Sequence, residues 1–286
     1  MFFFKRRKNN LKMFVAYHKD AVITQDLFKD FRSEVFTLLN TSINTGDNIA
    51  HKNPNYAEMS GWYWVWKNYL PTAQEDYIGF CHYRRFPDFN IRSNNGECTQ
   101  IKFKKFKKIF NRWKNQDLTK KFNGHDIIVA LKINFGEQNV YEQFEECCGE
   151  GHLDLALEVI KDKYPEYEEA FHKVMNSHEM FYCLNFIMKK PVLNEFFEWI
   201  FDFCAELDKR TNNWEGYSGY NIRMPAFLAE RLISVWLDYN ARDVLLLPGY
   251  LIINETSKDN LKFPRQTELE SDTGSAAVAQ SNLYVA

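Results

Sequence analysis

Short apolar runs that alternate with amphipathic segments constrain the fold of this chain more than any other feature. Residues 13–17, 77–80 and 126–130 form compact runs without helical periodicity, which is typical of buried strands. Longer segments between and after these runs predict helices. Strands that alternate with helices predict an α/β fold, with a central, mostly parallel sheet covered by helices on both sides.

The same patterns predict further elements. A helix should begin near residue 53, where either Asn53 before Pro54 or Asn55 with Glu58 caps its start, and it should end at Pro71. The other expected elements are helices at 102–121, 153–163, 166–175, 192–207 and 225–239, and strands at 181–188, 244–247 and 251–253.

Composition narrows the classes of function. A formal net charge of −2 over 286 residues provides no basic field for nucleic acid, so we expect no such partner. No window approaches the roughly 20 apolar residues of a membrane span. Apolar residues 1–4 precede basic residues 5–8, the reverse of a signal peptide, and the six cysteines form no CxxC pair. These features predict a cytoplasmic protein with reduced thiols.

Three segments stand apart from the central pattern. Residues 1–11 are a basic arm, and residues 256–286 are a polar tail without periodicity that we expect to be disordered. Over residues 102–121, aromatic residues recur at helical spacing among many lysines, which predicts a basic amphipathic helix. That helix either presents a solvated face over a core stripe or contacts anionic lipid head groups.

Ionic residues follow two of the expected strands. His18 and Lys19 come after the first strand, and the stretch YIGFCHYRRF runs from an apolar strand into His82, Arg84 and Arg85. Parallel sheets bind ligands beyond the carboxyl ends of their strands, so both groups should meet in one crevice. Arginine forks suit phosphates, and a helix start near residue 53 also favours an anion. A nucleotide diphosphate is therefore a candidate ligand, and ion pairs that bridge loops are the alternative.

The sequence contains no strong motif for a metal or a cofactor. The chain has no P-loop, GxGxxG, HExxH or Asp-x-Asp motif, so we expect no required cofactor, although Mn²⁺ or Mg²⁺ stays an alternative. Asp88, or His152 with Asp154, would then be the candidate ligands. For the latter pair, the start of a capped helix is the competing interpretation.

Several segments together resemble one bacterial family. They are DNIAHKNPNYAEMSGWYWVWKN, YIGFCHYRRF, HDIIVALK, YCLNFIMKK with the following FFEWIFDF, and RMPAFLAERLISVWL. The family is catalogued as domain of unknown function 4422 and occurs in capsule, exopolysaccharide and lipopolysaccharide gene clusters. Its members are regarded as glycosyltransferases of GT-A type. The resemblance implies one GT-A-like domain over residues 12–255. The sequence departs from the family pattern at Ala50-His51 and Phe86-Pro87.

The resemblance also implies a ligand and a set of site residues. The donor would be a UDP-hexose, with galactopyranose or galactofuranose as candidates, and the acceptor a polysaccharide or lipid-linked glycan. Trp62 and Trp66 would lie on the helix behind the donor, and Asn185 and Arg223 on the acceptor side. The donor-binding residues would be His18, Lys19, Asp47, Asn48, Lys52, Asn53, Tyr56, Tyr83, Arg84 and Arg85. The arginines would replace a metal on the diphosphate.

The chemistry of such a transfer indicates candidate catalytic groups. In an inverting enzyme a carboxylate takes the proton of the acceptor hydroxyl. Glu230 is the first candidate and His82 the second, whereas an ion pair of Glu230 with Arg223 or Arg231 is the structural alternative. The rival functions are a metal-dependent transferase and a non-catalytic nucleotide- or carbohydrate-binding module. We expect the protein to work in the cytoplasm, at the inner face of the cytoplasmic membrane.

Overall fold

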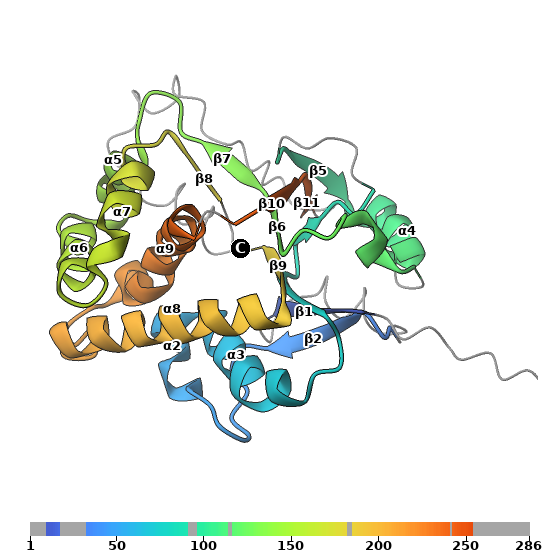
Figure 1. The fold of residues 1–286 in the computed structure, drawn as a ribbon, viewed down its shortest axis with the longest axis horizontal. Coiled ribbons are helices and arrows are strands. Elements are labelled where there is room, and N and C mark those ends of the chain that lie inside the picture. The colour runs from blue at the N-terminus through green and yellow to red at the C-terminus, as the bar shows by residue number, and fades with distance from the viewer. Residues whose placement is uncertain are drawn as a thin grey trace, which may run out of the picture.

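A computed structural model describes residues 10–17, 33–90, 96–113, 116–181, 185–240 and 242–253 (Figure 1). His18, Lys19, residues 1–9 of the basic arm and the whole 256–286 tail lie outside the described residues. Within the described part, a mixed sheet is flanked by helices, so the expected α/β class is confirmed.

The strands fall into two sheets. The large sheet contains β1 (Leu11–Tyr17), β2 (Phe36–Asn40), β3 (Tyr77–His82), β4 (Arg85–Pro87), β5 (Cys98–Lys102), β6 (Ile127–Ala130), β9 (Phe186–Lys189), β10 (Val244–Leu247) and β11 (Gly249–Ile253). The small sheet pairs β7 (Lys132–Asn134) with β8 (Glu179–Phe181).

The helices are α2 (Asn53–Tyr56), α3 (Met59–Trp64), α4 (Phe103–Trp113), α5 (Val140–Cys148), α6 (His152–Lys163), α7 (Glu168–Met175), α8 (Lys190–Arg210) and α9 (Met224–Tyr239). Short 3-10 turns are η1 (Ala50–Lys52), η3 (Leu70–Thr72), η4 (Leu118–Lys121), η5 (Pro165–Tyr167) and η6 (Gly219–Arg223), and η2 (Val65–Tyr69) is a π-helical turn. Among the helices of these described segments, none has the length and apolar character needed to cross a membrane.

The topology of the large sheet brings distant segments together. β1 lies between β2 and β3, and all three run parallel. β9 is inserted antiparallel between β3 and β6, and β10 runs parallel to β6. Beyond the end of β3, the sheet continues through β4 to β11 and β5. The carboxyl ends of β1, β3 and β6 therefore share one edge of the sheet.

Three of the expected elements differ from the structure. The expected strand at 181–188 is wrong, because β8 and β9 belong to different sheets. The helix expected from about residue 53 to 70 is broken at Ala57, whose φ of 47° ends α2. The expected helix at 102–121 is shorter, since α4 covers only Phe103–Trp113 and the preceding residues pair with β11.

Aromatic side chains form much of the core. Trp62 of α3, Phe80 of β3 and Phe197 of α8 are almost fully buried and in mutual contact, with ring centroids 5.7–6.3 Å apart. Such pairs each contribute about 0.5–1.5 kcal/mol beyond the burial of area. Gly79 of β3 is needed here, because a Cβ would lie 2.5 Å from Met13 Sδ and 2.6 Å from Ile187 Cγ1.

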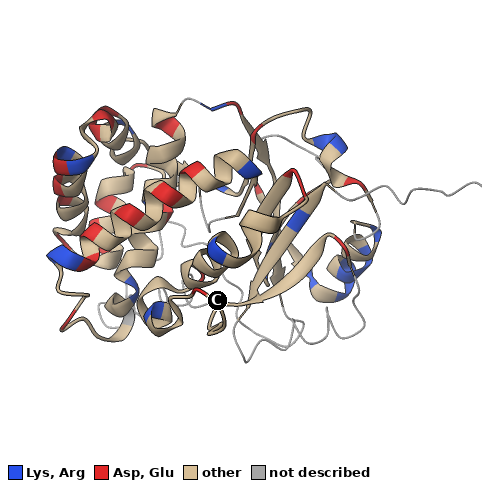
Figure 2. Ribbon diagram, turned by 60° about the horizontal axis from the view of Figure 1, so that its bottom comes forward, with Lys and Arg blue, Asp and Glu red and all other residues tan. Residues whose placement is uncertain are grey.

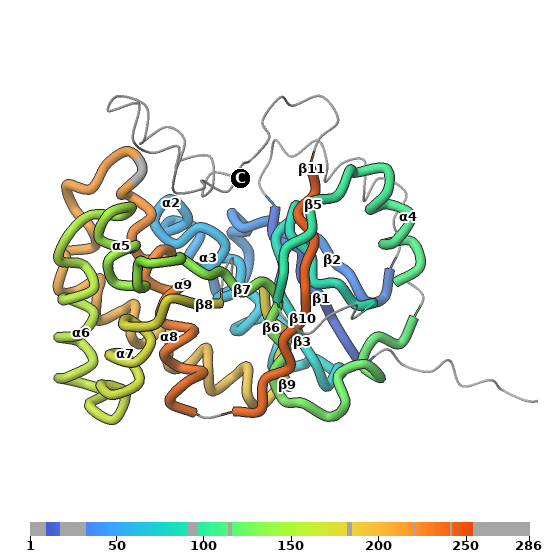
Figure 3. Tube along the Cα trace, turned by 90° about the horizontal axis from the view of Figure 1, so that it is seen from above, coloured from blue at the N-terminus to red at the C-terminus, as the bar shows by residue number. Residues whose placement is uncertain are grey.

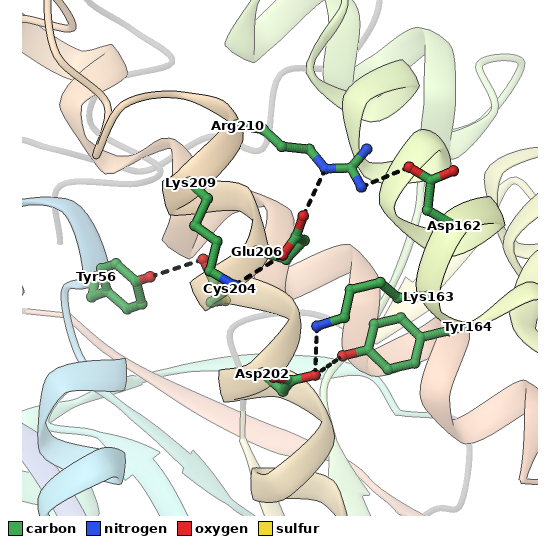
Figure 4. A network of polar contacts seen from close by, with 9 residues as sticks. All are labelled: Tyr56, Asp162, Lys163, Tyr164, Asp202, Cys204, Glu206, Lys209 and Arg210. Atoms are coloured by element: carbon green, nitrogen blue, oxygen red, sulfur yellow. Dashed lines mark hydrogen bonds and ion pairs between the residues drawn. The ribbon is translucent and has the colours of Figure 1, made fainter.

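Ion pairs connect α8 to the α6–η5 segment (Figure 4). Arg210 Nη2 lies 2.7 Å from Asp162 Oδ2, and Lys163 Nζ lies 3.0 Å from Asp202 Oδ2. Figures 1 and 3 show that α6 and α7 lie at one end of the molecule and α4 at the other, with the sheet between them.

Candidate active site

The ends of β1 and β3 lie side by side. Ala16 aligns with His82, and the amide of Tyr83 donates to the carbonyl of Ala16 at 3.0 Å. Tyr83 and Arg84 then form the turn of a hairpin, and Arg85 pairs with His82 as the first residue of β4. The two arginines therefore occupy different positions, one in the turn and one on a strand.

Arg84 has buried nitrogen atoms without hydrogen-bond partners in the described residues. Its side chain is partly buried, and its Nε and Nη2 atoms are inaccessible to solvent and have no hydrogen-bond partner among the described residues. Burial lowers the pKa of the Arg84 guanidinium; the charge of Arg85 lowers it further, and Tyr83 acts in the opposite direction. Buried N–H donors without acceptors are costly, so an anion placed against these two nitrogens would be favoured.

Asn185 connects this edge to the neighbouring strand. Its side chain is 1% exposed, and its Oδ1 accepts the amide hydrogen of His82 at 3.3 Å. Its backbone carbonyl accepts from the amide of Ala130, the last residue of β6. The Nδ2 atom of Asn185 is buried and unpartnered within the described segments, so this edge has a second unused hydrogen-bond donor.

Glu230 approaches the same region from α9. Its side chain is 12% exposed, and burial raises the pKa of its carboxyl to about 6, while Arg231 acts most strongly in the opposite direction. Arg85 also lowers the pKa of this carboxyl, which places the β4 arginine within electrostatic range. A carboxylate with a pKa near neutrality can accept and release a proton under physiological conditions.

The ion pair considered for Glu230 is present. Arg231 Nη1 lies 3.2 Å from Glu230 Oε2, and the Arg231 side chain is completely buried. Its Nη2 donates to Gln143 at 2.7 Å and its guanidinium lies 4.9 Å from the ring centre of Phe144. Arg231 therefore orients Glu230, and Arg223, at the end of η6, adds a second positive charge that acts on the carboxyl.

The expected donor-binding stretch makes mostly local contacts. Asn48 Nδ2 donates to Gly46 O at 2.8 Å, and Asn53 Nδ2 donates to Thr41 O and Ala57 O at 3.0 Å. The backbone amide of Asp47 donates to Asn68 at 3.1 Å. These contacts shape the loop before α2.

Lys52 and Tyr56 meet on a residue that sequence reasoning missed. Asp208 of α8, which is 4% exposed, accepts from Lys52 Nζ at 2.5 Å and from Tyr56 OH at 2.7 Å. Trp214 Nε1 donates to its other oxygen at 2.8 Å. Asp208 is one of several acids along α8, and nothing in the sequence distinguishes it or indicates partners at separations of 156 and 152 positions.

The residues named for a metal are engaged elsewhere. Asp88 is buried and accepts from Tyr250 OH at 2.9 Å. The two ring nitrogens of His152 contact Gly149 O and Tyr217 OH, and Asp154 accepts from Tyr141. Across the part of the chain that the structure describes, no three His, Cys, Asp or Glu side chains converge as a metal site requires.

A surface pocket of about 450 Å³ lies elsewhere. Trp66, Lys67, Asn194 and Glu198 are among its lining residues, together with the first residues of α8. Lys189, which precedes α8, pairs with Tyr77 at the start of β3. This pocket is therefore at the opposite end of β3 from His82 and is separate from the candidate site.

One solved structure shares the fold of this chain. The solved apo structure of WbbM, a bifunctional glycosyltransferase, superimposes with a TM-score of 0.71 at 23% identity, covering 86% of this chain and 46% of that one. This chain thus spans less than half the length of that protein, and the likeness shows a shared fold. No significant match was found among curated proteins. A family model matches residues 12–241, most of the sequence, and the chain therefore belongs to the family described as domain of unknown function (DUF4422).

Proposed function

We propose that this chain is a glycosyltransferase that moves a hexose from a UDP-sugar to a cell-surface polysaccharide or a lipid-linked glycan. One observation carries the proposal: the buried, unpartnered nitrogens of Arg84 lie beside Arg85 at the carboxyl edge of the sheet. This is where α/β sheets bind their ligands, and the fold is shared with a known glycosyltransferase. Galactose, as pyranose or furanose, is the proposed sugar.

The cations supply the first part of the mechanism. As the bond between the anomeric carbon and the diphosphate breaks, its electron pair leaves with UDP, and the negative charge on the diphosphate grows. Arg84 and Arg85 are fixed by the hairpin, so they need no rearrangement to stabilise this charge. The proposed reaction therefore favours a metal-independent route, with a metal-dependent transferase as the alternative.

The carboxylate of Glu230 supplies the second part. The acceptor hydroxyl oxygen attacks the anomeric carbon from the face opposite UDP, and its proton passes to Glu230, which gives inversion at that carbon. A pKa of about 6 leaves this group mostly ionised at neutral pH and still basic enough to take the proton. Asn185 and Arg223 are proposed on the acceptor side, and His82 is the alternative base.

A donor screen with two readouts tests the function. UDP-, GDP- and dTDP-hexoses are added to the whole protein, and thermal stability and nucleotide release are measured, with and without EDTA. A bound donor at 100 times its dissociation constant adds about 2.7 kcal/mol to the free energy of unfolding. Stabilisation and UDP release in the presence of EDTA support the full proposal. Stabilisation without release on any glycan acceptor would indicate a binding module, and release only with added metal would overturn the metal-independent route.

A further inference from the structure

The outer face of α4 is an unusually basic surface. At 100° per residue, Lys104, Lys105, Lys107, Lys108 and Arg112 fall within an arc of about 160° of the helix, and all five are exposed. The helix contains no acidic residue. Lys104, Lys105, Lys108 and Arg112 form no ion pair with an acid in the described ranges. We call these five residues the basic face.

The opposite side of α4 is fixed in the core. Phe106 lies 4.7 Å from Phe86 of β4, and Trp113 lies 6.1 Å from Tyr250 of β11, measured between ring centroids. These aromatic residues are buried, so they are available neither for insertion into lipid nor for stacking on nucleobases. The expectation that this segment is an amphipathic helix is correct, but its apolar stripe serves the fold. Any partner of the basic face must therefore bind through charge.

Acidic residues gather away from the basic face (Figure 2). Glu195, Glu198 and Asp202 are exposed along α8, and basic residues there are paired, as Lys163 is with Asp202 at 3.0 Å. An anionic surface attracts the α4 end of the molecule and repels the α8 side. This asymmetry selects one orientation, even though the whole chain carries a formal charge of −2.

We propose that the basic face docks the protein on an anionic lipid bilayer, parallel to the membrane and without insertion. A flat, extended array of lysines on a rigid helix fits a layer of negative head groups. Nucleic acid is disfavoured, because three of the four aromatic residues of α4, Phe106, Phe110 and Trp113, are buried and cannot stack on bases. This inference concerns where the protein binds and is independent of the sugar, the donor and the catalytic base.

A charge-reversal experiment tests the docking surface. The full-length protein is floated with phosphatidylcholine vesicles, with and without about 30% phosphatidylglycerol, at about 50 mM salt, where screening is weak. The test variant is Lys104→Glu/Lys108→Glu, whose positions are exposed and one helical turn apart. The control is Lys161→Glu/Lys209→Glu, which makes the same change in net charge at the acidic end of the molecule. The basic residues at 5–8 are present in both variants, so a difference reports on α4.

The expected result is binding to the anionic vesicles alone. The test variant should lose about 30-fold or more in partition coefficient, as expected for two basic residues at about 1 kcal/mol each, while the control stays within about threefold of the wild type. Equal binding to both vesicle types, or wild-type binding by Lys104→Glu/Lys108→Glu, would overturn the proposal. The proposal would also fail if the protein bound duplex DNA more tightly than anionic vesicles at the same salt and the test variant lost that DNA binding. Matching circular dichroism and melting temperatures ensure that both variants are folded.

Discussion

Replacing Asp208 by asparagine tests the buried contact between the loop before α2 and the end of α8. The carboxylate accepts from Lys52, Tyr56 and Trp214. In the variant, one amide oxygen can still accept from Trp214, and the amide nitrogen faces the other two groups. The Tyr56 hydroxyl can rotate to accept from that nitrogen and donate to Cys204 O, 3.3 Å away. The ammonium of Lys52 has no such option, because it is only a donor.

The main loss is therefore one charge-assisted hydrogen bond. Such a bond contributes about 1.5–3 kcal/mol, and Lys52 is 30% exposed, so its freed ammonium can reach water. We expect Asp208→Asn to lower the free energy of unfolding by about 2 kcal/mol, measured by urea denaturation with tryptophan fluorescence. In a Lys52→Met background the same substitution should cost about 0.5 kcal/mol, because the charged partner is already absent.

Two results would refute this reasoning. A loss below about 0.5 kcal/mol in the wild-type background would mean that Asp208 is not fixing the loop. An equal loss in the Lys52→Met background would assign the effect to Tyr56 or Trp214. The Lys52→Met variant also tests the donor-binding role proposed for this lysine. If Lys52 contacts the diphosphate, KM for the sugar donor rises, whereas a purely structural lysine changes stability alone.

Three further outcomes follow from the site and the core. Glu230→Gln should lower turnover about 100-fold or more with unchanged UDP affinity, and near-normal turnover of this variant would transfer the role to His82. In the wild type, kcat/KM should fall tenfold per pH unit below about 6, because the base must be ionised. Arg84→Lys and Arg85→Lys should each weaken UDP binding through loss of the planar fork, and wild-type transfer rates in both would contradict the diphosphate assignment. Gly79→Ala should cost about 1–3 kcal/mol by overpacking, since its Cβ enters the space between β1 and β9, and an unchanged urea midpoint would disprove this close packing.

Long apolar patterns were the most predictable part of the fold. β3, α8 and α9 appear close to their expected bounds, because burial on a sheet or along a helix leaves a clear periodicity. The elements that were missed are β2, β4, β5, β7 and α5. β2 mixes polar and apolar residues, and β4 is a short strand whose pairing is supplied by β11, more than 160 positions later. Pairing at such separation leaves no local signal.

Some residues of the candidate site could be predicted from the sequence, and others could not. His82, Arg84 and Arg85 were found because an apolar strand stops abruptly at ionic residues, a break that sequence alone displays. Asp208 could not be assigned, since its partners come from α2 and from a turn after α8. The electrostatic effect of Arg85 on Glu230 likewise depends on tertiary structure, since the two residues are far apart in the sequence.

The insertion of β9 between β3 and β6 has a consequence for synthesis on the ribosome. β1, β2 and β3 lie within the first 82 residues and can pair early, whereas β6 has no partner in the large sheet until β9 emerges. Until then, a growing chain exposes unpaired edges of β3 and β6, which are prone to pair with other chains. Residues Phe186–Lys189 join β3 to β6, so a nascent chain that stalls before this strand should depend on chaperones more than one that has passed it, in which β5 still waits for β11.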